Sequence, residues 1–249
     1  MTERESRIFV PQPLKSDERL QLSGDQHHHL ARVLRLRAGA TVKLFDGLGG
    51  EYAATIEDVR REATIVRVGE HYDIERESPV PIRLAQGIGR GERTDYAIQK
   101  AVELGATSIV PLLTRRGVVR LDRERSARRH EHWRGIVVHA CQQCGRNRIP
   151  ELLTAVGLHE WLNNYQSGAL DLLMDPDGEH GINGLDYRGG LVTLLVGPEG
   201  GLEGGEIDAA HAAGFRSLAL GSRTLRTETA AVAGITAIQV KWGDLGAPA

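Results

Sequence analysis

The chain has 249 residues, of which 41% are hydrophobic, and this length suits one large domain or two smaller ones. No apolar run of about 18 residues occurs, and the charged stretch Met1–Ser6 lacks the apolar core of a signal peptide, so neither a membrane span nor secretion is expected. The two cysteines are three residues apart and cannot build the disulfide framework of a secreted protein. These features predict a cytoplasmic protein.

Charge is distributed unevenly along the chain, although the net charge is only −2. Between Arg115 and Arg148 there are ten Arg and three acidic residues, whereas from Asp171 onward there are eleven acidic and five basic residues. The planar Arg guanidinium suits phosphate oxygens and stacks on bases, so the basic segment favours a localised contact with RNA. A solvated helix face is the alternative, and the charge pattern alone leaves both open.

Residues 1–72 contain mainly short strand patterns. Strands are expected at Arg7–Val10, Leu20–Ser23, Thr41–Asp46, Glu51–Val59 and Ala63–Val68. One helix is expected at about Gln26–Arg35, with Asp25 as its N-cap. Many short strands with one helix predict a small β-barrel. The polar stretch 73–81 contains Pro79 and Pro81, which forbid a helix and predict a linker.

From residue 82 to residue 249, apolar strands alternate with helices. Strands are expected at Ile82–Ile88, Ser108–Leu113, Leu170–Met174, Leu191–Val196 and Ser217–Leu220. Helices are expected at Thr94–Leu104, Glu131–Gln143, Glu203–Ala213 and Thr229–Val240. This alternation predicts an α/β domain with a parallel sheet covered on both faces, and ligands of such sheets bind at the carboxyl ends of the strands.

The first candidate ligand loop, Gly197–Gly201, joins a buried strand to a helix, and its glycines allow a ligand to approach the backbone closely. It matches neither the dinucleotide-binding nor the P-loop pattern, which disfavours a dinucleotide oxidoreductase. Glu199 at its centre would repel a phosphate, so an uncharged adenosine group fits better than a nucleotide. A purely structural turn is the alternative.

A second candidate loop, 218–231, leads from a strand into a helix of small residues, with Thr227 as the expected cap. Arg226 and Glu228 are candidates for a site at this strand end, or for a simple surface ion pair. The small residues Ala230, Ala231, Ala233, Gly234 and Ala237 give the helix a smooth face, which suits either core packing or a subunit interface.

Two further clusters contain residue types that bind metals. Cys141 and Cys144 lack a second ligand pair, and His27–His29 point in three directions from a helix, so no metal site is expected. Arg146 and Arg148 follow the cysteines, and Arg32 and Arg35 share one helix face. These arginines are candidates for contacts with RNA phosphates, with a solvated surface as the alternative.

Taken together, these motifs resemble the RsmE-type family of small-subunit rRNA uracil-N3 methyltransferases, within the knotted SPOUT superfamily. The matching strings are Arg7-Ile8-Phe9-Val10, His29-Leu30-x-x-Val33-Leu34-Arg35, Gly91-Glu92-Arg93-Thr94-Asp95-Tyr96-x-Ile98-Gln99-Lys100-Ala101-x-Glu103-Leu104-Gly105, Ala140-Cys141-Gln142-Gln143-Cys144-Gly145-Arg146, Gly197-Pro198-Glu199-Gly200-Gly201 and Leu220-Gly221-x-x-x-Leu225-Arg226-x-Glu228-Thr229-Ala230. They cover nearly the whole chain. Ile8 replaces the usual aromatic, and Gln142 replaces the usual Glu, which argues against an acid or base role at position 142.

The resemblance implies a PUA-like β-barrel for RNA binding over residues 1–72, a linker over 73–81, and a SPOUT α/β domain with a deep trefoil knot over 82–249. It also implies a homodimer that binds S-adenosyl-L-methionine inside the knot, with no metal and no membrane. The cofactor residues that it implies are Met174, Pro176, Gly197, Pro198, Glu199, Gly200, Gly201, Leu220, Gly221, Leu225 and Thr229.

The activity that the resemblance implies is methylation of N3 of a uracil in 16S rRNA of the 30S subunit. Arg226 is expected to stabilise the imide anion or orient the base, and Glu228 to accept the proton or to hold Arg226. The expected RNA contacts are Arg7, Arg32, Arg35 and Arg146. Two alternatives remain: a related knotted enzyme acting on tRNA or on a ribose 2′-OH, and a non-catalytic RNA-binding protein.

Overall fold

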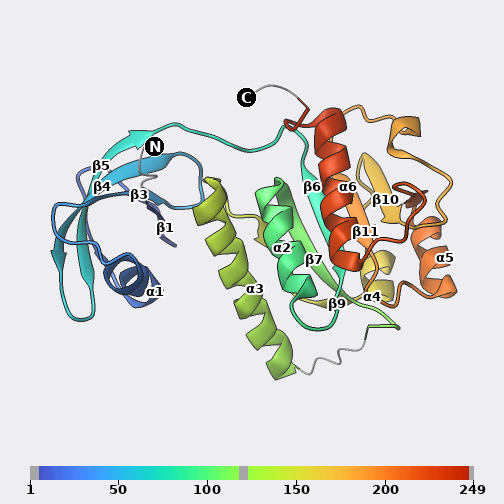
Figure 1. Cartoon of the computed structure of the whole chain (residues 1–249), viewed down its shortest axis with the longest axis horizontal. Helices are drawn as coiled ribbons and strands as arrows, with labels where there is room; N and C mark the ends of the chain where they lie inside the picture. The colour runs from blue at the N-terminus through green and yellow to red at the C-terminus, as the bar shows by residue number, and fades with distance from the viewer. Residues whose placement is uncertain (1–5, 118–122, 247–249) are drawn as a thin grey trace. The chain divides into compact units, whose positions relative to one another are not determined.

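The computed structural model describes residues 6–117 and 123–246, so Met1–Glu5 and, within the basic segment, Arg120 and Asp122 lie outside the described residues (Figure 1). Its contacts divide the chain into two compact units. Unit 1 comprises residues 1–77 and 141–149, and unit 2 comprises residues 78–140 and 150–249. The sequence predicts a division at the linker 73–81. It does not predict that residues 141–149 return to unit 1. Within the described ranges, no helix has the length and apolar character needed to cross a membrane.

Unit 1 is built on a curled five-stranded sheet. Its strands are β1 (Arg7–Phe9), β2 (Arg19–Leu22), β3 (Thr41–Phe45), β4 (Glu51–Val59) and β5 (Thr64–Tyr72), in the order β1-β3-β4-β5-β2. The β1–β3 pair is parallel and the other pairs are antiparallel. Irregular register between β4 and β5 increases the local twist. The five predicted strands are confirmed. In the described sheet β1 and β2 are the two edges and do not pair with each other, so the sheet is curled but is not a closed barrel.

The helix of unit 1 consists of α1 (Gly24–His28), which continues into the π-helical turn η1 (His29–Val33). Its N-cap is Ser23, so the prediction of Asp25 as the cap is wrong: Asp25 lies in the first turn instead. Leu30 is fully buried and packs into the apolar core against the sheet. His27 is also buried, with Nδ1 2.8 Å from the Thr64 hydroxyl, which is a structural role for this histidine.

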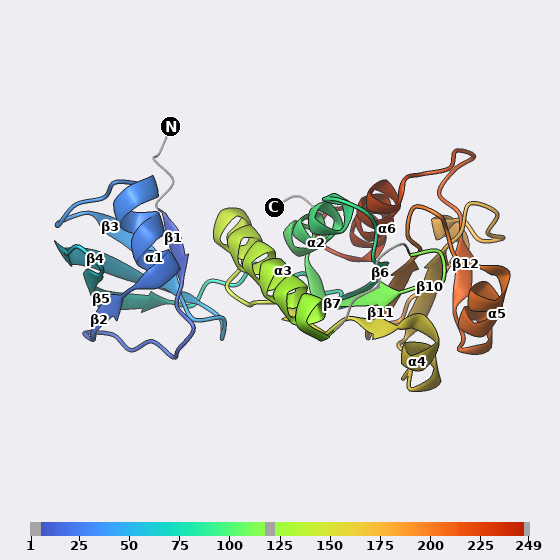
Figure 2. The same ribbon diagram turned by 90° about the horizontal axis from the view of Figure 1, so that it is seen from below.

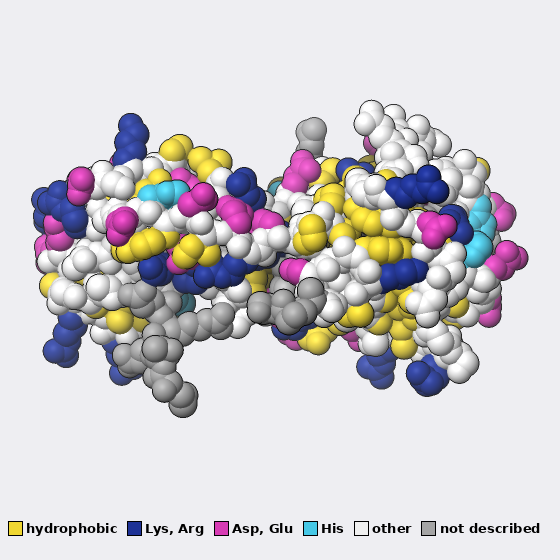
Figure 3. Space-filling view, turned by 90° about the horizontal axis from the view of Figure 1, so that it is seen from above, with side chains coloured by type: hydrophobic (Ala, Val, Ile, Leu, Met, Phe, Trp, Pro, Cys, Tyr) yellow, Lys and Arg dark blue, Asp and Glu magenta, His cyan; other side chains and the backbone are white. Residues whose placement is uncertain are grey.

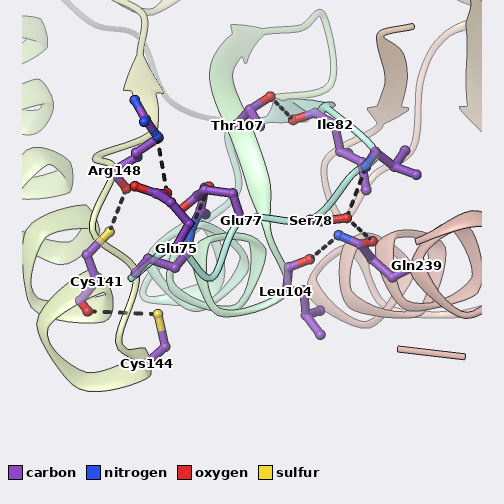
Figure 4. A network of polar contacts seen from close by, with 12 residues as sticks. Glu75, Glu77, Ser78, Ile82, Leu104, Thr107, Cys141, Cys144, Arg148 and Gln239 are labelled. Atoms are coloured by element: carbon purple, nitrogen blue, oxygen red, sulfur yellow. Dashed lines mark hydrogen bonds and ion pairs between the residues drawn. The ribbon is translucent and has the colours of Figure 1, made fainter. Parts of the chain in front are cut away.

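Residues 141–149 add a second layer of polar contacts to unit 1. The Gln142 side-chain oxygen accepts a hydrogen bond from the backbone N–H of Phe9 at 3.0 Å, a role that requires only an acceptor. Arg148 pairs with Glu75 at 3.2 Å, and its carbonyl accepts from the Cys141 thiol (Figure 4). Both cysteines are free thiols with hydrogen bonds to backbone carbonyls.

Unit 2 contains a parallel sheet. Its strands are β6 (Ile82–Gly87), β7 (Ala106–Leu113), β8 (Glu151–Leu152), β9 (Val156–Gly157), β10 (Leu170–Met174), β11 (Val192–Val196) and β12 (Arg216–Leu218). The order is β12-β10-β11-β6-β7-β8, with β9 also pairing with β7, and every pair is parallel. The carboxyl ends of the strands therefore meet at one edge, as predicted.

Helices cover both faces of this sheet (Figures 1 and 2). On one face lie α2 (Arg93–Glu103) and α6 (Thr227–Trp242), and on the other lie α4 (Leu158–Asn163) and α5 (Gly204–Ala212). Leu194 and Leu195 of β11 serve opposite faces: a Cβ on Gly234 of α6 would lie 2.7 Å from Leu194, whereas Leu195 packs with Phe215 beside α5. The small residue at 234 thus serves core packing.

Two longer-range features complete unit 2. Gln239 of α6 is fully buried, accepts a hydrogen bond from Ser78 at 2.6 Å and donates to the Leu104 carbonyl at 2.8 Å (Figure 4). Helix α3 (Arg123–Cys144) is 22 residues long, and it belongs to unit 2 up to residue 140 and to unit 1 from residue 141. Its Trp133 is buried and donates to Asp95 of α2 at 2.9 Å. A short 3₁₀ turn, η2 (Ile182–Gly184), lies between β10 and β11.

Candidate functional site

A cavity of about 590 Å³ lies in unit 2 at the carboxyl ends of β10, β11 and β12. Three segments form its walls: 174–177 at the end of β10, 197–202 after β11, and 220–227, which leads into α6. Its apolar lining includes Leu173, Val196 and Leu218 at the strand ends. The site therefore consists largely of loop backbone above an apolar floor, at the position where a parallel sheet binds ligands.

Glycines let the 197–202 loop pack closely over the sheet. A Cβ on Gly87, the last residue of β6, would lie 2.6 Å from the backbone nitrogen of Pro198, so any side chain there would displace the loop. Gly201 has a φ of +70° and donates to the Pro198 carbonyl at 2.9 Å, which closes a tight turn. The glycine-rich sequence is thus required by the shape of this wall.

A buried hydrogen-bond relay joins two of the loops. Gln86 donates to the Thr227 hydroxyl at 2.8 Å, and that hydroxyl donates to the Gly197 carbonyl at 2.5 Å. Arg226, not Thr227, is the N-cap of α6, and Thr227 is its first helical residue. The prediction of Thr227 as a cap is therefore wrong, because its hydroxyl fixes the neighbouring loop instead of the helix end.

A second, more open cavity of about 1060 Å³ adjoins the first. The two cavities share Arg93, Arg116, Glu199, Gly200 and Arg226. The open cavity is also lined by Arg90, Gly91, Glu92, Tyr96, Glu228 and Thr229. The smaller cavity thus opens into a wider cleft that contains four arginines and one half-exposed tyrosine.

Arg226 and Glu228, the two predicted catalytic residues, lie close to this junction. Arg226 lines both cavities, whereas Glu228 lines the open one. No ion pair joins them within the described part of the chain, which argues against the simple surface pair. Glu228 Oε2 is buried and has no hydrogen-bond partner among the described residues. Its place in the first turn of α6 favours a carboxylate electrostatically.

The structure brings ten of the eleven predicted cofactor residues together around the smaller cavity. These are Met174, Pro176, Gly197, Pro198, Glu199, Gly200, Gly201, Leu220, Gly221 and Leu225. Thr229 is the third residue of α6, and it lines the open cavity instead of the smaller one. The cavity also carries acidic side chains from Asp175 and Asp177, and basic ones from Arg116 and Arg223.

Several lining residues received no individual role from the sequence, among them Arg90, Arg93, Arg116 and Tyr96. The three arginines follow the carboxyl ends of β6 and β7. Ligands of parallel sheets bind at the carboxyl ends of strands, so this general rule could have predicted these arginines as site residues. Tyr96 lies in the first turn of α2, directly after the β6 loop. Because these residues are far in sequence from the 197–201 and 220–226 loops, no local pattern predicted that they line the same site.

Arg7 and Arg146 do not form an exposed RNA surface in unit 1. The Arg7 guanidinium pairs with Glu51, and these two side chains are only 8% and 5% exposed. Arg146 is 4% exposed and pairs with Glu77, while its carbonyl accepts a hydrogen bond from Arg7 at 3.2 Å. The prediction of direct RNA contacts through these two residues is thus corrected, because the Arg7 guanidinium is paired within the sheet and the Arg146 guanidinium is paired with Glu77 of the 73–81 segment.

Arg32 and Arg35, the other two predicted RNA contacts, are exposed on unit 1. Arg35 has a φ of +55°, at the point where the chain leaves the helix. On the face shown in Figure 3, Lys and Arg side chains lie next to acidic ones.

No group of three or more His, Cys, Asp or Glu side chains suited to a metal ion occurs among residues 6–117 and 123–246. Burial raises the pKa of the Cys141 thiol to about 12, so this side chain is a poor source of thiolate. The cysteine pair therefore contributes packing and hydrogen bonds to unit 1.

Comparison with known proteins gives consistent results over the whole chain. Residues 76–239 match the family model of an RNA methyltransferase domain, and residues 22–68 match that of an RNA methyltransferase PUA domain. The ribosomal RNA small subunit methyltransferase E of Buchnera aphidicola from Schizaphis graminum is 31% identical, covering 98% of this chain and 100% of that protein. The chain belongs to the RsmE-type family of RNA methyltransferases.

Solved structures of similar proteins support this assignment. A methyltransferase of Legionella pneumophila, in complex with S-adenosylmethionine, is 38% identical, with a TM-score of 0.95 over 98% of this chain and 100% of that chain. The ribosomal RNA small subunit methyltransferase E of Neisseria gonorrhoeae, bound to S-adenosylmethionine, is 35% identical, with a TM-score of 0.91 over 97% and 100%. The RsmE-type family thus shares both units of this fold.

Proposed function

We propose that this chain transfers a methyl group from S-adenosylmethionine to N3 of a uracil in 16S rRNA of the small ribosomal subunit. The observation that carries the proposal is the junction of two cavities. The smaller one is enclosed by the 197–202 and 220–227 loops and opens, past Arg226, into a cleft containing several arginines. Relatives with both units are named for methylation of small-subunit ribosomal RNA, and two similar structures hold the cofactor.

The smaller cavity fits S-adenosylmethionine in size and in chemistry. Its volume of about 590 Å³ lies within the usual range of small-molecule sites. The carboxylates of Asp175 and Asp177 complement the cationic groups of the cofactor, and Arg223 complements its carboxylate. The backbone groups of the three loops suit an uncharged adenosine. When bound, the cofactor supplies a methyl group already activated by its sulfonium.

The residues of this chain then have to bind the base and manage its N3 proton. Arg226 lines both cavities, so its guanidinium is placed to orient the uracil and to stabilise the imide anion that develops. Glu228 lines the open cleft, and its carboxylate is our candidate acceptor for the N3 proton.

Arg226→Ala and Glu228→Gln test these roles. We expect Arg226→Ala to lower kcat by about 10²–10³-fold, because one donor to the developing charge is lost. Transfer of a labelled methyl group to 30S subunits and to naked 16S RNA, with the nucleoside identified by mass spectrometry, measures this. Arg188→Ala is the matched control, since Arg188 is exposed and lines neither cavity. Near-normal turnover of Arg226→Ala at saturating cofactor would contradict the assignment.

The same assay separates the remaining alternatives. A methylated ribose, or methylation of tRNA instead of 16S RNA, would identify a related enzyme of different specificity. Absence of cofactor binding by calorimetry would identify a non-catalytic RNA-binding protein. The trefoil knot, the homodimer, the RNA-binding role of unit 1 through Arg32 and Arg35, and the cytoplasmic location stay predictions that accompany this proposal.

A further inference from the structure

Glu199 lies at the centre of the 197–201 loop and lines both cavities of unit 2. Its Oε1 accepts a hydrogen bond from the backbone N–H of Arg90 at 2.8 Å and pairs with the Arg93 guanidinium at 3.1 Å. Arg90 belongs to the 88–92 loop between β6 and α2, and Arg93 is the first residue of α2. One carboxylate therefore connects the loop after β11 with the loop after β6.

Gly89 shows how closely the two loops approach. A Cβ at this position would lie 2.7 Å from both carboxylate oxygens of Glu199, so a side chain at 89 and the present position of the carboxylate are incompatible. The Gly89 N–H also donates to the Thr94 hydroxyl at 2.9 Å, which fixes the loop to the start of α2. The space at Gly89 is thus occupied by the side chain of Glu199.

The 88–92 loop and the start of α2 supply the side chains of the open cleft that suit RNA. Arg90, Arg93 and Tyr96 all line this cleft, and Tyr96 is 47% exposed. Within the described part of the chain, the Arg90 guanidinium makes no ion pair and is available to a ligand. Single-stranded RNA is bound by cationic side chains at its phosphates and by aromatic rings that stack on its bases.

We propose that Glu199 is a positioning residue for the RNA substrate. Its carboxylate holds the 88–92 loop beside the cofactor cavity, so that Arg90, Arg93 and Tyr96 meet the nucleotide next to the methyl donor. The inference rests on the proposed function and assigns Glu199 no contact with the reacting atoms. It also explains why an acidic residue stands in a glycine-rich loop, where it would repel a phosphate.

Three substitutions test this role. Glu199→Ala removes both contacts, Glu199→Gln keeps an acceptor for the Arg90 N–H but loses the charge, and Gly89→Ala displaces the carboxylate while leaving Glu199 intact. Alanine at 89 is compatible with the backbone, because Gly89 is not among the residues with positive φ. Gly205→Ala in α5 is the control, since a Cβ there meets nothing within 4 Å.

For each variant, calorimetry measures S-adenosylmethionine affinity, a fluorescence titration measures binding of a 16S RNA fragment, and label transfer gives kcat and KM. We expect Glu199→Ala and Gly89→Ala to weaken RNA binding and raise KM for RNA about tenfold, as loss of a charge-assisted hydrogen bond does. Since Glu199 also lines the smaller cavity, cofactor affinity should fall as well, but by less than RNA affinity. The RNA affinity of Glu199→Gln should lie between those of Glu199→Ala and the unmodified chain. A variant that combines Glu199→Ala with Gly89→Ala should bind RNA no more weakly than Glu199→Ala alone, because both changes remove the same interaction.

Two results would overturn the inference. A loss of cofactor affinity equal to the loss of RNA affinity would assign Glu199 to the cofactor, and unchanged RNA binding in both Glu199→Ala and Gly89→Ala would leave it without a positioning role. If the unmodified chain bound RNA but transferred no methyl group, the proposed function would fail. The RNA titration would still decide the role of Glu199.

Discussion

At the residue scale, the Cys141 thiol is fully buried in unit 1, and burial raises its pKa to about 12. Its reactivity with iodoacetamide at pH 8 should therefore be very low in the folded protein and normal after unfolding, because only the thiolate reacts. Because the thiol pKa in the folded protein lies above the ordinary value of 9.0, this thiol contributes to the stability of the fold below pH 9.0. The contribution is lost as the pH rises toward 12. Mass mapping of alkylated peptides measures the reactivity, and rapid labelling of native Cys141 would contradict the prediction.

The same scale shows what the sequence could not reveal. The residue types at Arg7 and Arg146 were equally consistent with RNA binding and with internal ion pairs. Their acidic partners, Glu51 and Glu77, are 44 and 69 residues away along the chain, so no local pattern connects them. By contrast, glycines and a proline in a loop after an apolar strand indicate a turn through local geometry alone, and the 197–201 loop was predictable for that reason.

At the element scale, the position of the 197–202 loop depends on the Thr227 hydroxyl. Thr227→Val should remove the donor to the Gly197 carbonyl and one of the two acceptors of the Gln86 amide, which keeps its bond to the Gly87 carbonyl. We expect it to lower the free energy of unfolding by about 1–3 kcal/mol. It should also weaken cofactor binding, because the 197–202 loop forms one wall of the smaller cavity. Thr227→Ser keeps the hydroxyl and is the matched control. Chemical denaturation and calorimetry measure both effects, and equal stability of the Val and Ser variants would disprove the relay.

Elements with strong local patterns were predictable, and elements that depend on tertiary contacts were not. Strand β4 and strand β10 have the predicted bounds, since each is an apolar or alternating run between turn residues. The two-residue strands β8 and β9 are too short for any periodicity, and the six-residue helix α4 was missed for the same reason. Helix α3 begins eight residues before its predicted start, because its charged first half lacks an apolar stripe.

At the scale of the whole molecule, RNA binding and cofactor binding are expected to be separable. Arg32 and Arg35 are exposed on unit 1, whereas the cavities lie within unit 2. Changing both arginines to Gln should weaken binding of a 16S RNA fragment and lower the salt slope by about 1–2, as loss of one or two phosphate contacts does. Cofactor affinity should not change.

The control for this experiment is Arg60→Gln, since the exposed Arg60 of the same unit already pairs with Asp58. Titrations at several salt concentrations give the slope. An unchanged slope in the double variant would remove Arg32 and Arg35 from the RNA surface, whereas an equal change in the Arg60 variant would indicate a non-specific effect of charge.

The division of the chain into units was only partly predictable. The change from short strands to alternating strands and helices near residue 80 is visible in the sequence, because the two patterns have different periodicities. Nothing in the composition of residues 141–149 distinguishes them from the surrounding helix and loop. Their membership of unit 1 follows from the buried pairs at Arg7 and Arg146, which only the three-dimensional contacts reveal.

Since unit 1 draws on two separate stretches of chain, it cannot be completed while the polypeptide is still short. Domains generally fold as units while they emerge during translation, starting from the N-terminus. Here the Arg7–Glu51 pair lies within the first 77 residues. Glu77, however, gains its partner Arg146 only after residues 141–149 have been synthesised. A nascent chain stalled at residue 77 would therefore hold an incomplete unit 1, whereas a chain extended beyond residue 149 contains all of its residues.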